Sequence, residues 1–202
     1  MTQQFHDTVL SADALDQLYR EARSYNGWHD KNVSEDQIRQ IYELTKMGPT
    51  SANMQPGRFV WCRSQESRDK LASMASEGNQ KKIKTAPVVV IIGYDIDFHE
   101  ELPWLFPHTD AKSWFEGDEE GRKTGAARNS ALQGAYLMLA ARAIALDCGP
   151  MSGVDLDKIT EHFFADQPRV KADWVCAIGY GDKTTIFERS PRPDFEKFNR
   201  ID

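Results

Sequence analysis

The sequence has few cysteines, and this already narrows the class of protein. Its 202 residues include 3 cysteines, Cys62, Cys148 and Cys176, which are widely spaced and form no CxxC pair. A disulfide-stapled secreted domain or a cysteine-based zinc site needs more cysteines at closer spacing. Each of the three stands in apolar sequence, so we expect buried, free thiols in a reduced, intracellular protein.

Long hydrophobic runs are also absent. The longest, Ala86 to Tyr94, has the length of a buried strand, whereas a membrane helix needs about 20 apolar residues. The amino-terminal segment Met1–Asp7 is polar and ends in an acid, so it lacks the basic and apolar parts of a secretory signal. These absences predict a cytoplasmic protein with no membrane contact.

An excess of positive charge is missing as well. The chain carries 25 basic and 31 acidic residues, a formal net charge of -6, which argues against a nucleic-acid module that depends on a basic face. With 40% hydrophobic residues and no linker or internal repeat, residues 1–202 are expected to form one domain. Folding of a chain this long hides roughly 70% of its unfolded surface.

The sequence contains none of the familiar catalytic motifs at the required residue spacing. There is no P-loop and no GxGxxG after a strand, and the histidines never reach the spacing of an HExxH metal helix, so no metal site is predicted. The segment GPMSG, residues 149–153, puts Ser152 one position too late for a G-x-S-x-G nucleophile elbow. We interpret Gly149-Pro150 as the stop of a helix.

Periodicity and capping residues predict a largely helical chain. Ser11 caps a first helix that ends near Arg23 to Gly27, and Ser34 with Gln37 forms a capping box for a second, which Gly48-Pro49 ends. The long segment Thr124 to Leu146 is apolar on nearly every side after Ala131, as expected for a helix buried inside a protein or in an interface. Asp155 caps a short helix that runs to Phe164.

Three apolar segments read as strands. Arg58 to Arg63 and Val88 to Tyr94 are predicted to be central strands, and Trp174 to Gly179 is the third. A helix from Ser64 to Ala75 lies between the first two, and this β-α-β alternation by itself indicates a parallel pair.

Two further segments lack a sustained period. Asp95 to Gly125 mixes aromatic residues with prolines and acids, and the glycines at 117, 121 and 125 favour a flexible loop. Gly181 to Asp202 is expected to run extended over a surface.

Three polar segments stand out: RSYNGW at 23–28, PTSANMQP at 49–56, and the tail from Arg189 to Arg192. Taken singly, they are explained by a helix end, a turn and a charged terminus. Together they supply arginine for a bidentate phosphate contact and Ser, Asn and Gln for the edges of a ring. That combination suits a phosphorylated heteroaromatic cofactor.

In this order, followed by GPMSG after the long helix, IGYGD and an Arg/Pro tail, the segments resemble the nitroreductase family of FMN flavoproteins over nearly the whole chain. The segments LPWLFPH (102–108) and SWF (113–115) are similar to its malonic-semialdehyde reductase subgroup, which acts in pyrimidine catabolism. The resemblance implies an α+β fold with a central, mostly antiparallel sheet flanked by helices, a long buried central helix and an extended C-terminal tail. It also implies a homodimer with FMN at the interface.

The resemblance also assigns positions around FMN. Arg23 and Ser24 begin the phosphate motif, and Arg189 or Arg192 closes on the phosphate. Lys82 is a further candidate near the pyrimidine ring. The expected cofactor-binding residues are Arg23, Ser24, Asn26, Ser51, Asn53, Gln55, Asn79, Pro150, Met151, Ser152, Gly153, Arg189 and Arg192. The expected substrate contacts are Arg58, Trp104, His108, Trp114 and Phe115.

Two of these substrate positions leave alternatives open. Many relatives have Trp after the Gln-Pro pair, where this chain has Gly57-Arg58. Arg58 is then either a contact for a substrate carboxylate or a solvated residue at the start of a strand. A proton for an aldehyde acceptor could come from His108, from a pocket hydroxyl or from water.

The implied activity is that of an oxidoreductase. NADH or NADPH delivers a hydride to flavin N5 and leaves, and an acceptor takes the hydride in a second, ping-pong step, so no side-chain nucleophile is required. The expected reaction is reduction of malonic semialdehyde to 3-hydroxypropionate. The alternatives are a reductase of broad nitro or quinone acceptors, a non-catalytic flavin-binding protein, and a purely structural dimer module.

Overall fold

The centre of the molecule is a four-stranded sheet in the order β1-β2-β4-β3, in which every neighbouring pair is antiparallel. The computed structural model describes residues 8–202, and the segment 1–7, in which we expect no secretory signal, lies outside the described residues. The strands are β1 (Gly57–Cys62), β2 (Val88–Asp95), β3 (Asp147–Met151) and β4 (Val170–Gly179).

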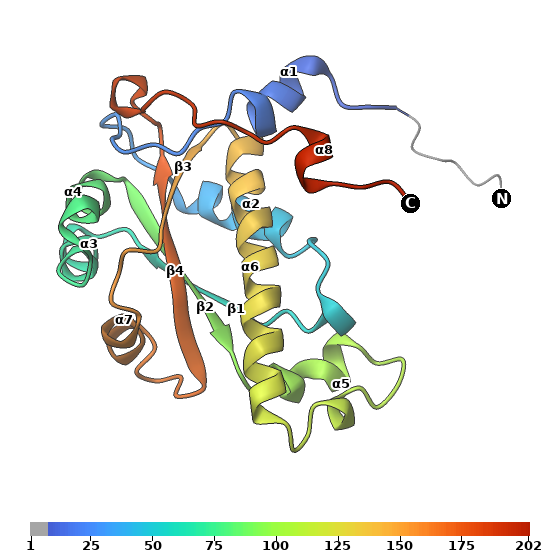
Figure 1. Ribbon diagram of the computed structural model, residues 1–202. Coiled ribbons are helices and arrows are strands. Elements are labelled where there is room, and N and C mark those ends of the chain that lie inside the picture. Colours follow the sequence, from blue (N-terminus) through green and yellow to red (C-terminus); the bar gives the residue numbers. More distant parts are fainter. Residues whose placement is uncertain (1–7) are drawn as a thin grey trace.

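Helices cover both faces of this sheet, with α3, α4 and α7 on one side and α2 and α6 on the other (Figure 1). The helices are α1 (Ala12–Leu15), α2 (Glu35–Thr45), α3 (Gln65–Ala72), α4 (Glu77–Thr85), α5 (Leu102–Leu105), α6 (Glu119–Ala143), α7 (Leu156–Phe163) and α8 (Phe195–Phe198). The α+β fold with an antiparallel sheet and a long central helix is confirmed.

The hydrophobic core follows from the two-residue period of the strands. In β2, Val89 and Ile91 face α3, α4 and α7, while Val88, Val90 and Ile92 face α2 and α6, and all five side chains are completely buried. An uninterrupted apolar run is therefore what a central strand between two helical layers requires.

The parallel pair that the β-α-β alternation suggests is wrong. β1 and β2 are antiparallel, with Cys62 opposite Val89. The connection between them holds two helices, α3 and α4, rather than one. The chain therefore returns to the end of the sheet at which β1 finished, and no parallel crossover is made.

The prediction that the first of the three strands is central is also wrong, because β1 is at the edge of the sheet. Its aromatic residues Phe59 and Trp61 are half-buried against the α2 and α6 layer. A strand that packs large side chains on one helical layer looks like a central strand in sequence, although only one side of its backbone is paired.

Helix α6 begins and ends earlier than the periodicity predicts. The Asp118 side chain accepts a hydrogen bond from the Gly121 N–H (2.8 Å) and caps the helix at 119. Gly121 and Gly125 therefore belong to the helix and not to a flexible loop. At the other end, Ala145 has φ +60, a left-handed conformation that reverses the chain after Ala143.

Gly149-Pro150 is not the stop of that helix. Both residues lie in β3, where Pro150 is opposite Cys176 of β4. Proline lacks the N–H that a central strand needs, so it is found on edge strands. β3 is such an edge, and the segment expected to be a turn is the end of a strand that continues into the exposed residues 152 and 153.

The remaining helical predictions hold in part. The capping box of Ser34 with Gln37 and the Asp155 cap of α7 are both present. The first helix is shorter than expected, because α1 passes into a π-helical turn, Asp16–Arg20, and ends before Arg23. Its inward residues are only half-buried, so little packing energy extends it.

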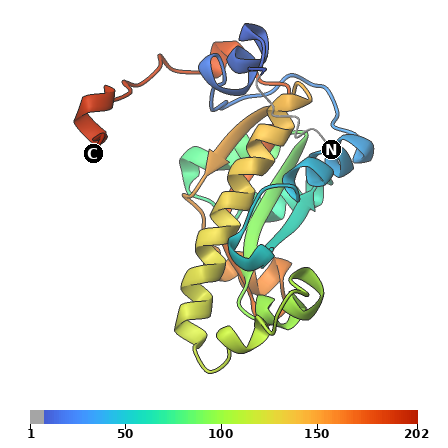
Figure 2. The same cartoon turned by 90° about the vertical axis from the view of Figure 1, so that its right-hand side faces the viewer.

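Two segments are less regular. Residues 96–118 form short turns and α5 around a separate apolar cluster of Met54, Phe98, Leu102, Ala111 and Ala126. The tail is extended apart from a 3-10 turn, Lys183–Thr185, and the single turn α8. Its end does not run over the surface of this chain as predicted, because Figure 2 shows it leading away from the body of the molecule.

The three cysteines are buried and free, as predicted. Within residues 8–202, no helix has both the length and the apolar character that a membrane span needs.

Candidate functional site

The predicted phosphate motif lies along the free edge of β3. Ser24 forms a parallel bridge with Cys148, and the Tyr25 N–H donates to the Cys148 carbonyl (3.0 Å). The Asn26 side chain donates to the Thr185 carbonyl (2.9 Å), and the Arg23 guanidinium donates to the Phe187 carbonyl. The segment 23–26 and the start of the tail are thus held together beside β3.

The two tail arginines are placed differently. Arg189 Nη2 donates to the carbonyls of Arg20 (2.6 Å) and Ala22 (3.1 Å), so its side chain lies against the phosphate motif. Arg192 hydrogen-bonds the carbonyls of its own neighbours, residues 190 and 191. The structure therefore brings Arg189, and not Arg192, next to the segment that contains Arg23.

Asn79 of α4 contacts the residues that directly follow β3. The Asn79 Nδ2 donates to the Gly153 carbonyl (3.1 Å), and the Ser76 N–H donates to it as well (3.0 Å). A Cβ on Gly153 would lie 2.8 Å from both Asn79 Nδ2 and Ser76 Oγ. A side chain here would have to displace the Asn79 amide and the Ser76 hydroxyl. A hollow of about 480 Å³ opens over Ser152 and Gly153. Lys82 lies on the same helix as Asn79, and its backbone carbonyl accepts a hydrogen bond from Nε1 of Trp28, the last residue of the segment 23–28 (3.3 Å).

The segment 51–55 forms a second group of predicted residues, and its backbone is strained. Ala52, Asn53 and Gln55 have φ of +48, +49 and +39, a left-handed region that costs a residue with a side chain on the order of 1 kcal/mol. Strain of this kind persists only where the surroundings hold it, and it gathers at binding sites.

This strained loop borders a cavity with a volume of about 690 Å³. Four of the predicted cofactor and substrate residues line it, namely Asn53, Gln55, Arg58 and Trp104. Its other walls are a mixture of aromatic, aliphatic, charged and amide side chains, among them Tyr42, Lys46, Phe59, Trp61, Glu101, Leu105 and Gln133. The cavity is thus suited to a flat ligand with a polar edge.

Arg58 does not enter the cavity as a free cation. Its Nη2 is 2.7 Å from Asp95 Oδ2, and its Nη1 donates to the carbonyls of Gln55 and Gly57 (3.1 Å each). A substrate carboxylate would therefore compete with Asp95 for the guanidinium.

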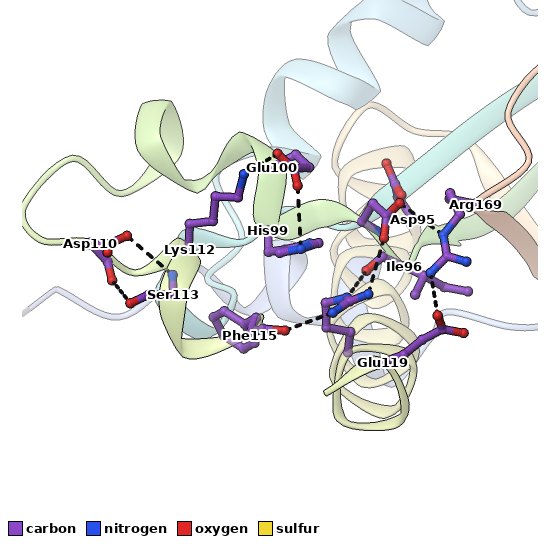
Figure 3. A network of polar contacts seen from close by, with 12 residues as sticks. Asp95, Ile96, His99, Glu100, Asp110, Lys112, Ser113, Phe115, Glu119 and Arg169 are labelled. Carbon is purple, nitrogen blue, oxygen red and sulfur yellow. Dashed lines mark hydrogen bonds and ion pairs between the residues drawn. The ribbon is translucent and has the colours of Figure 1, made fainter. Parts of the chain in front are cut away.

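The aromatic segment 96–118 contributes Glu101, Trp104 and Leu105 to the cavity lining. A network of charged contacts, shown in Figure 3, holds this segment in place. Lys112 Nζ is 2.6 Å from Glu100 Oε2, and this hydrogen bond lowers the pKa of Glu100. Arg169 bridges Asp97 (3.0 Å) and Glu119 (3.2 Å), and its hydrogen bond lowers the pKa of Glu119. The Lys112–Glu100 pair lies within the segment, and Arg169, which directly precedes β4, links the start of the segment at Asp97 to the first residue of α6.

Arg122 completes the network from inside. It is 9% exposed, and it donates to the carbonyls of Ile96 (3.2 Å) and Phe115 (2.9 Å). A buried guanidinium that satisfies two carbonyls of an irregular segment replaces the hydrogen bonds that a helix or strand would have made.

The other predicted substrate residues lie elsewhere in this segment. The rings of Phe98 and Phe115 are in edge contact at 5.1 Å, and Phe115 is half-buried. His108 contacts the edge of Phe106 at 5.2 Å, and Trp114 is 58% exposed. Of the five, the structure therefore places Arg58 and Trp104 at the cavity, and His108, Trp114 and Phe115 outside its lining.

The predicted cofactor residues form two groups that the protomer keeps apart. Arg23, Arg189, Asn79 and residues 150–153 lie at the β3 edge and toward α4, whereas the loop 51–55 lies against α6 on the opposite face of the sheet.

The β3 group is chemically suited to FMN. A guanidinium has five N–H donors, so Arg23 and Arg189 keep donors for a phosphate beyond those given to backbone carbonyls. Asn79 offers an amide for a ring edge, and the absence of a side chain at Gly153 leaves room for a close approach to the backbone. Among residues 8–202, no group of His, Cys, Asp and Glu is arranged to hold a metal ion.

Two residues at this site are not among those predicted from the sequence. Asn129 and Gln133 of α6 are 5% and 3% exposed and bind the backbone of the loop 51–57. Two amides four residues apart within an apolar helix are the signal that could have identified them.

The chain is similar in sequence to known proteins. Residues 19–182 match the model of the nitroreductase family. A protein of Stenotrophomonas maltophilia strain R551-3, named "Putative NADH dehydrogenase/NAD(P)H nitroreductase", is 54% identical over 193 residues, which are 96% of this chain and 98% of that one. A protein of Polynucleobacter asymbioticus with the same name is 50% identical over 194 residues, again 96% and 98% of the two chains.

Solved structures share the fold. A Bacillus subtilis protein described as a nitroreductase superposes with a TM-score of 0.86 at 20% identity, over 95% of this chain and 100% of that one. A protein of Exiguobacterium sibiricum, crystallised in complex with FMN, gives a TM-score of 0.84 at 22% identity, over 96% and 100% of the two chains.

Proposed function

The chain belongs to the nitroreductase family, and from that premise we propose that it is an FMN-dependent NAD(P)H oxidoreductase which works as a homodimer. The observation that carries the proposal is the division of the binding residues into two groups on opposite faces of the sheet. One copy would contribute the β3 edge and the other the strained loop, so that each FMN lies between two chains.

In this arrangement each group has its own task. Arg23 and Arg189 bind the phosphate, Asn79 and the backbone at Gly153 bind the ring, and Ser51, Asn53 and Gln55 approach from the other copy. FMN, when bound, accepts a hydride from NAD(P)H and passes it to an acceptor. The protein binds, orients and shields the ring, and no side-chain nucleophile is needed.

The exposed apolar surface supports two copies. Along α6, Ala131, Leu132, Ala135 and Tyr136 are exposed on the side away from the sheet, with Leu132 at 47% and Tyr136 at 39%. An apolar stripe of this kind on a 25-residue helix is typical of an interface. The tail adds Phe195 and Phe198, which are 53% and 70% exposed.

For the acceptor, we propose malonic semialdehyde, which would be reduced to 3-hydroxypropionate. Arg58 at the cavity supports an acceptor that carries a carboxylate, which would have to replace Asp95 as the partner of its guanidinium. A second candidate is a broad range of nitro and quinone acceptors, which the aromatic walls of Tyr42, Phe59, Trp61 and Trp104 favour. Steady-state rates with both kinds of acceptor distinguish them, and a higher kcat/KM for the aldehyde supports the first.

The visible spectrum of the purified protein tests the central proposal. We expect a yellow protein, or one that becomes yellow on addition of FMN, and oxidation of NAD(P)H faster than with free FMN. Arg23→Ala should release FMN more readily, while Arg39→Ala on the exposed side of α2 should not. A protein that stays colourless with added FMN contradicts the proposal, and a coloured protein without NAD(P)H oxidation would be a flavin-binding protein only.

A further inference from the structure

We propose that Asn129 and Gln133 of α6 are positioning residues that hold the strained loop 51–57 in the shape in which it contacts a ligand. That this ligand is FMN depends on the proposed function above. The hold on the loop is a property of this chain, and it is measurable whether or not FMN binds.

The loop needs an external hold because its own backbone resists its shape. Three of its residues with side chains, Ala52, Asn53 and Gln55, adopt positive φ. Inside the loop, the Asn53 N–H donates to the Thr50 carbonyl (3.0 Å) and the Gln55 N–H to Thr50 Oγ1 (3.2 Å). Turns of this size usually place glycine at such positions, so further contacts must offset the strain.

Helix α6 supplies those contacts at both ends of the loop. Asn129 Oδ1 accepts from the Ser51 N–H (2.8 Å). Gln133 Oε1 accepts from the Gly57 N–H, and Gln133 Nε2 donates to Gln55 Oε1, each at 2.7 Å. The Gln55 amide in turn donates to Asn53 Oδ1 (3.1 Å), so the contact from α6 reaches two of the strained residues.

The two amides are placed for this task. They are four residues apart and therefore on one face of α6, and both are more than nine-tenths buried. Asn129 is itself fixed by a hydrogen bond from its Nδ2 to the Gly125 carbonyl (2.9 Å). A buried amide with both its donor and its acceptor in use has a defined orientation.

Gly57 fits the same interpretation. A Cβ at this position would lie 2.8 Å from Gln133 Oε1 and 2.9 Å from the ring of Phe59. Any side chain here would displace the Gln133 amide from the loop. The absence of a side chain at position 57 therefore leaves the space that the Gln133 amide occupies.

The experiment compares Gln133→Leu, Asn129→Leu and Leu137→Ala with the wild-type dimer. Leucine keeps the helix and the approximate volume but removes the hydrogen bonds to the loop. Leu137 is buried on the same face of α6, one turn after Gln133, and packs in the core, so its truncation controls for a general loss of stability. Gln133→Glu keeps the acceptor for Gly57 and loses the donor to Gln55.

Two measurements are made on each variant: hydrogen-deuterium exchange of residues 50–57, and the Kd for FMN with the absorption spectrum of the bound flavin. We expect both leucine variants to exchange these amides faster. Their Kd should rise by about tenfold or more, the equivalent of one buried hydrogen bond. Gln133→Glu should be intermediate, and Leu137→Ala should change neither measurement although it lowers the melting temperature.

Unchanged exchange in the loop of Gln133→Leu would overturn the inference, and so would an equal effect of Leu137→Ala. If Gln133→Leu does not fold, Gln133→Glu and Asn129→Leu decide by the same two measurements. If the wild-type protein binds no FMN, the proposed function fails, and the exchange measurement alone still decides whether α6 holds the loop.

Discussion

At the scale of single residues, burial controls the chemistry of the thiols. Cys62 is 1% exposed, and burial raises its pKa from 9.0 to about 11. Because the thiolate is the reactive form, we expect no labelling of native protein by an aromatic disulfide reagent at pH 8. All 3 cysteines should react after unfolding. Rapid labelling of the native protein would contradict the buried placement.

The same pKa shift has a consequence for stability. Between pH 9 and about 11 the unfolded chain loses the Cys62 proton that the folded chain keeps. The folded state then binds more protons, so the contribution of this thiol to stability falls as the pH rises through that window. Cys62→Ala should show a shallower decline in urea midpoint between pH 8 and pH 10 than the wild type.

Arg122 illustrates how one residue can organise a whole segment. Arg122→Met keeps the apolar stem but leaves the carbonyls of Ile96 and Phe115 without their donor. We expect a loss of about 2 kcal/mol in the free energy of unfolding, measured by urea denaturation. Arg128→Met, at an exposed position of the same helix, should change it by less than about 0.5 kcal/mol.

At the scale of elements, two glycines of α6 should respond in opposite directions to alanine. A Cβ on Gly134 would lie 2.2 Å from the Trp174 ring of β4, whereas a Cβ on Gly125 meets nothing within 4 Å. Gly134→Ala should therefore destabilise by about 1–3 kcal/mol through overpacking. Gly125→Ala should stabilise by up to about 1 kcal/mol through helix propensity.

Thermal or urea denaturation of the two variants side by side checks this pair. If both stabilise, the close packing of α6 on β4 at Gly134 is contradicted. The comparison isolates packing because both changes add one methyl group to the same helix.

At the scale of the whole molecule, the apolar stripe on α6 predicts dependence on a second copy. Leu132→Glu puts a charge on the exposed stripe, and burying it unpaired in an interface should raise the Kd of the dimer by about a hundredfold. Sedimentation should show the mass fall from twice 23.0 kDa toward 23.0 kDa, with loss of bound FMN. Lys70→Glu on α3, an exposed position across the sheet, should leave the mass unchanged.

Elements were more predictable than their arrangement. The capping box at Ser34, the Asp155 cap and the apolar run of β2 depend on residues close in sequence, and they were found correctly. The edge position of β1, the left-handed turn at Ala145 and the strand role of Pro150 depend on distant partners. Local patterns contain no information about those partners.

The site divides in the same way. The chemistry of Arg23, Asn53, Gln55 and Asn79 could be proposed from the sequence, because donors suited to a phosphate and a ring edge can be recognised by residue type and order. Folding alone separated these residues onto opposite faces of the sheet. It also brought Arg189 against the carbonyls of Arg20 and Ala22, next to Arg23, which is 166 positions away by number.

The sequence by itself determined the helices with clear caps, the buried strand β2, the free buried thiols and the kinds of donor available to a ligand. These follow from propensity, periodicity and residue chemistry, which act over a few neighbours. The tertiary structure decided which strands lie at the edges, which tail arginine meets the phosphate motif, and that Asn129 and Gln133 hold a strained loop. Those outcomes depend on hydrogen bonds and packing between residues far apart in the chain, where buried polar groups must find partners.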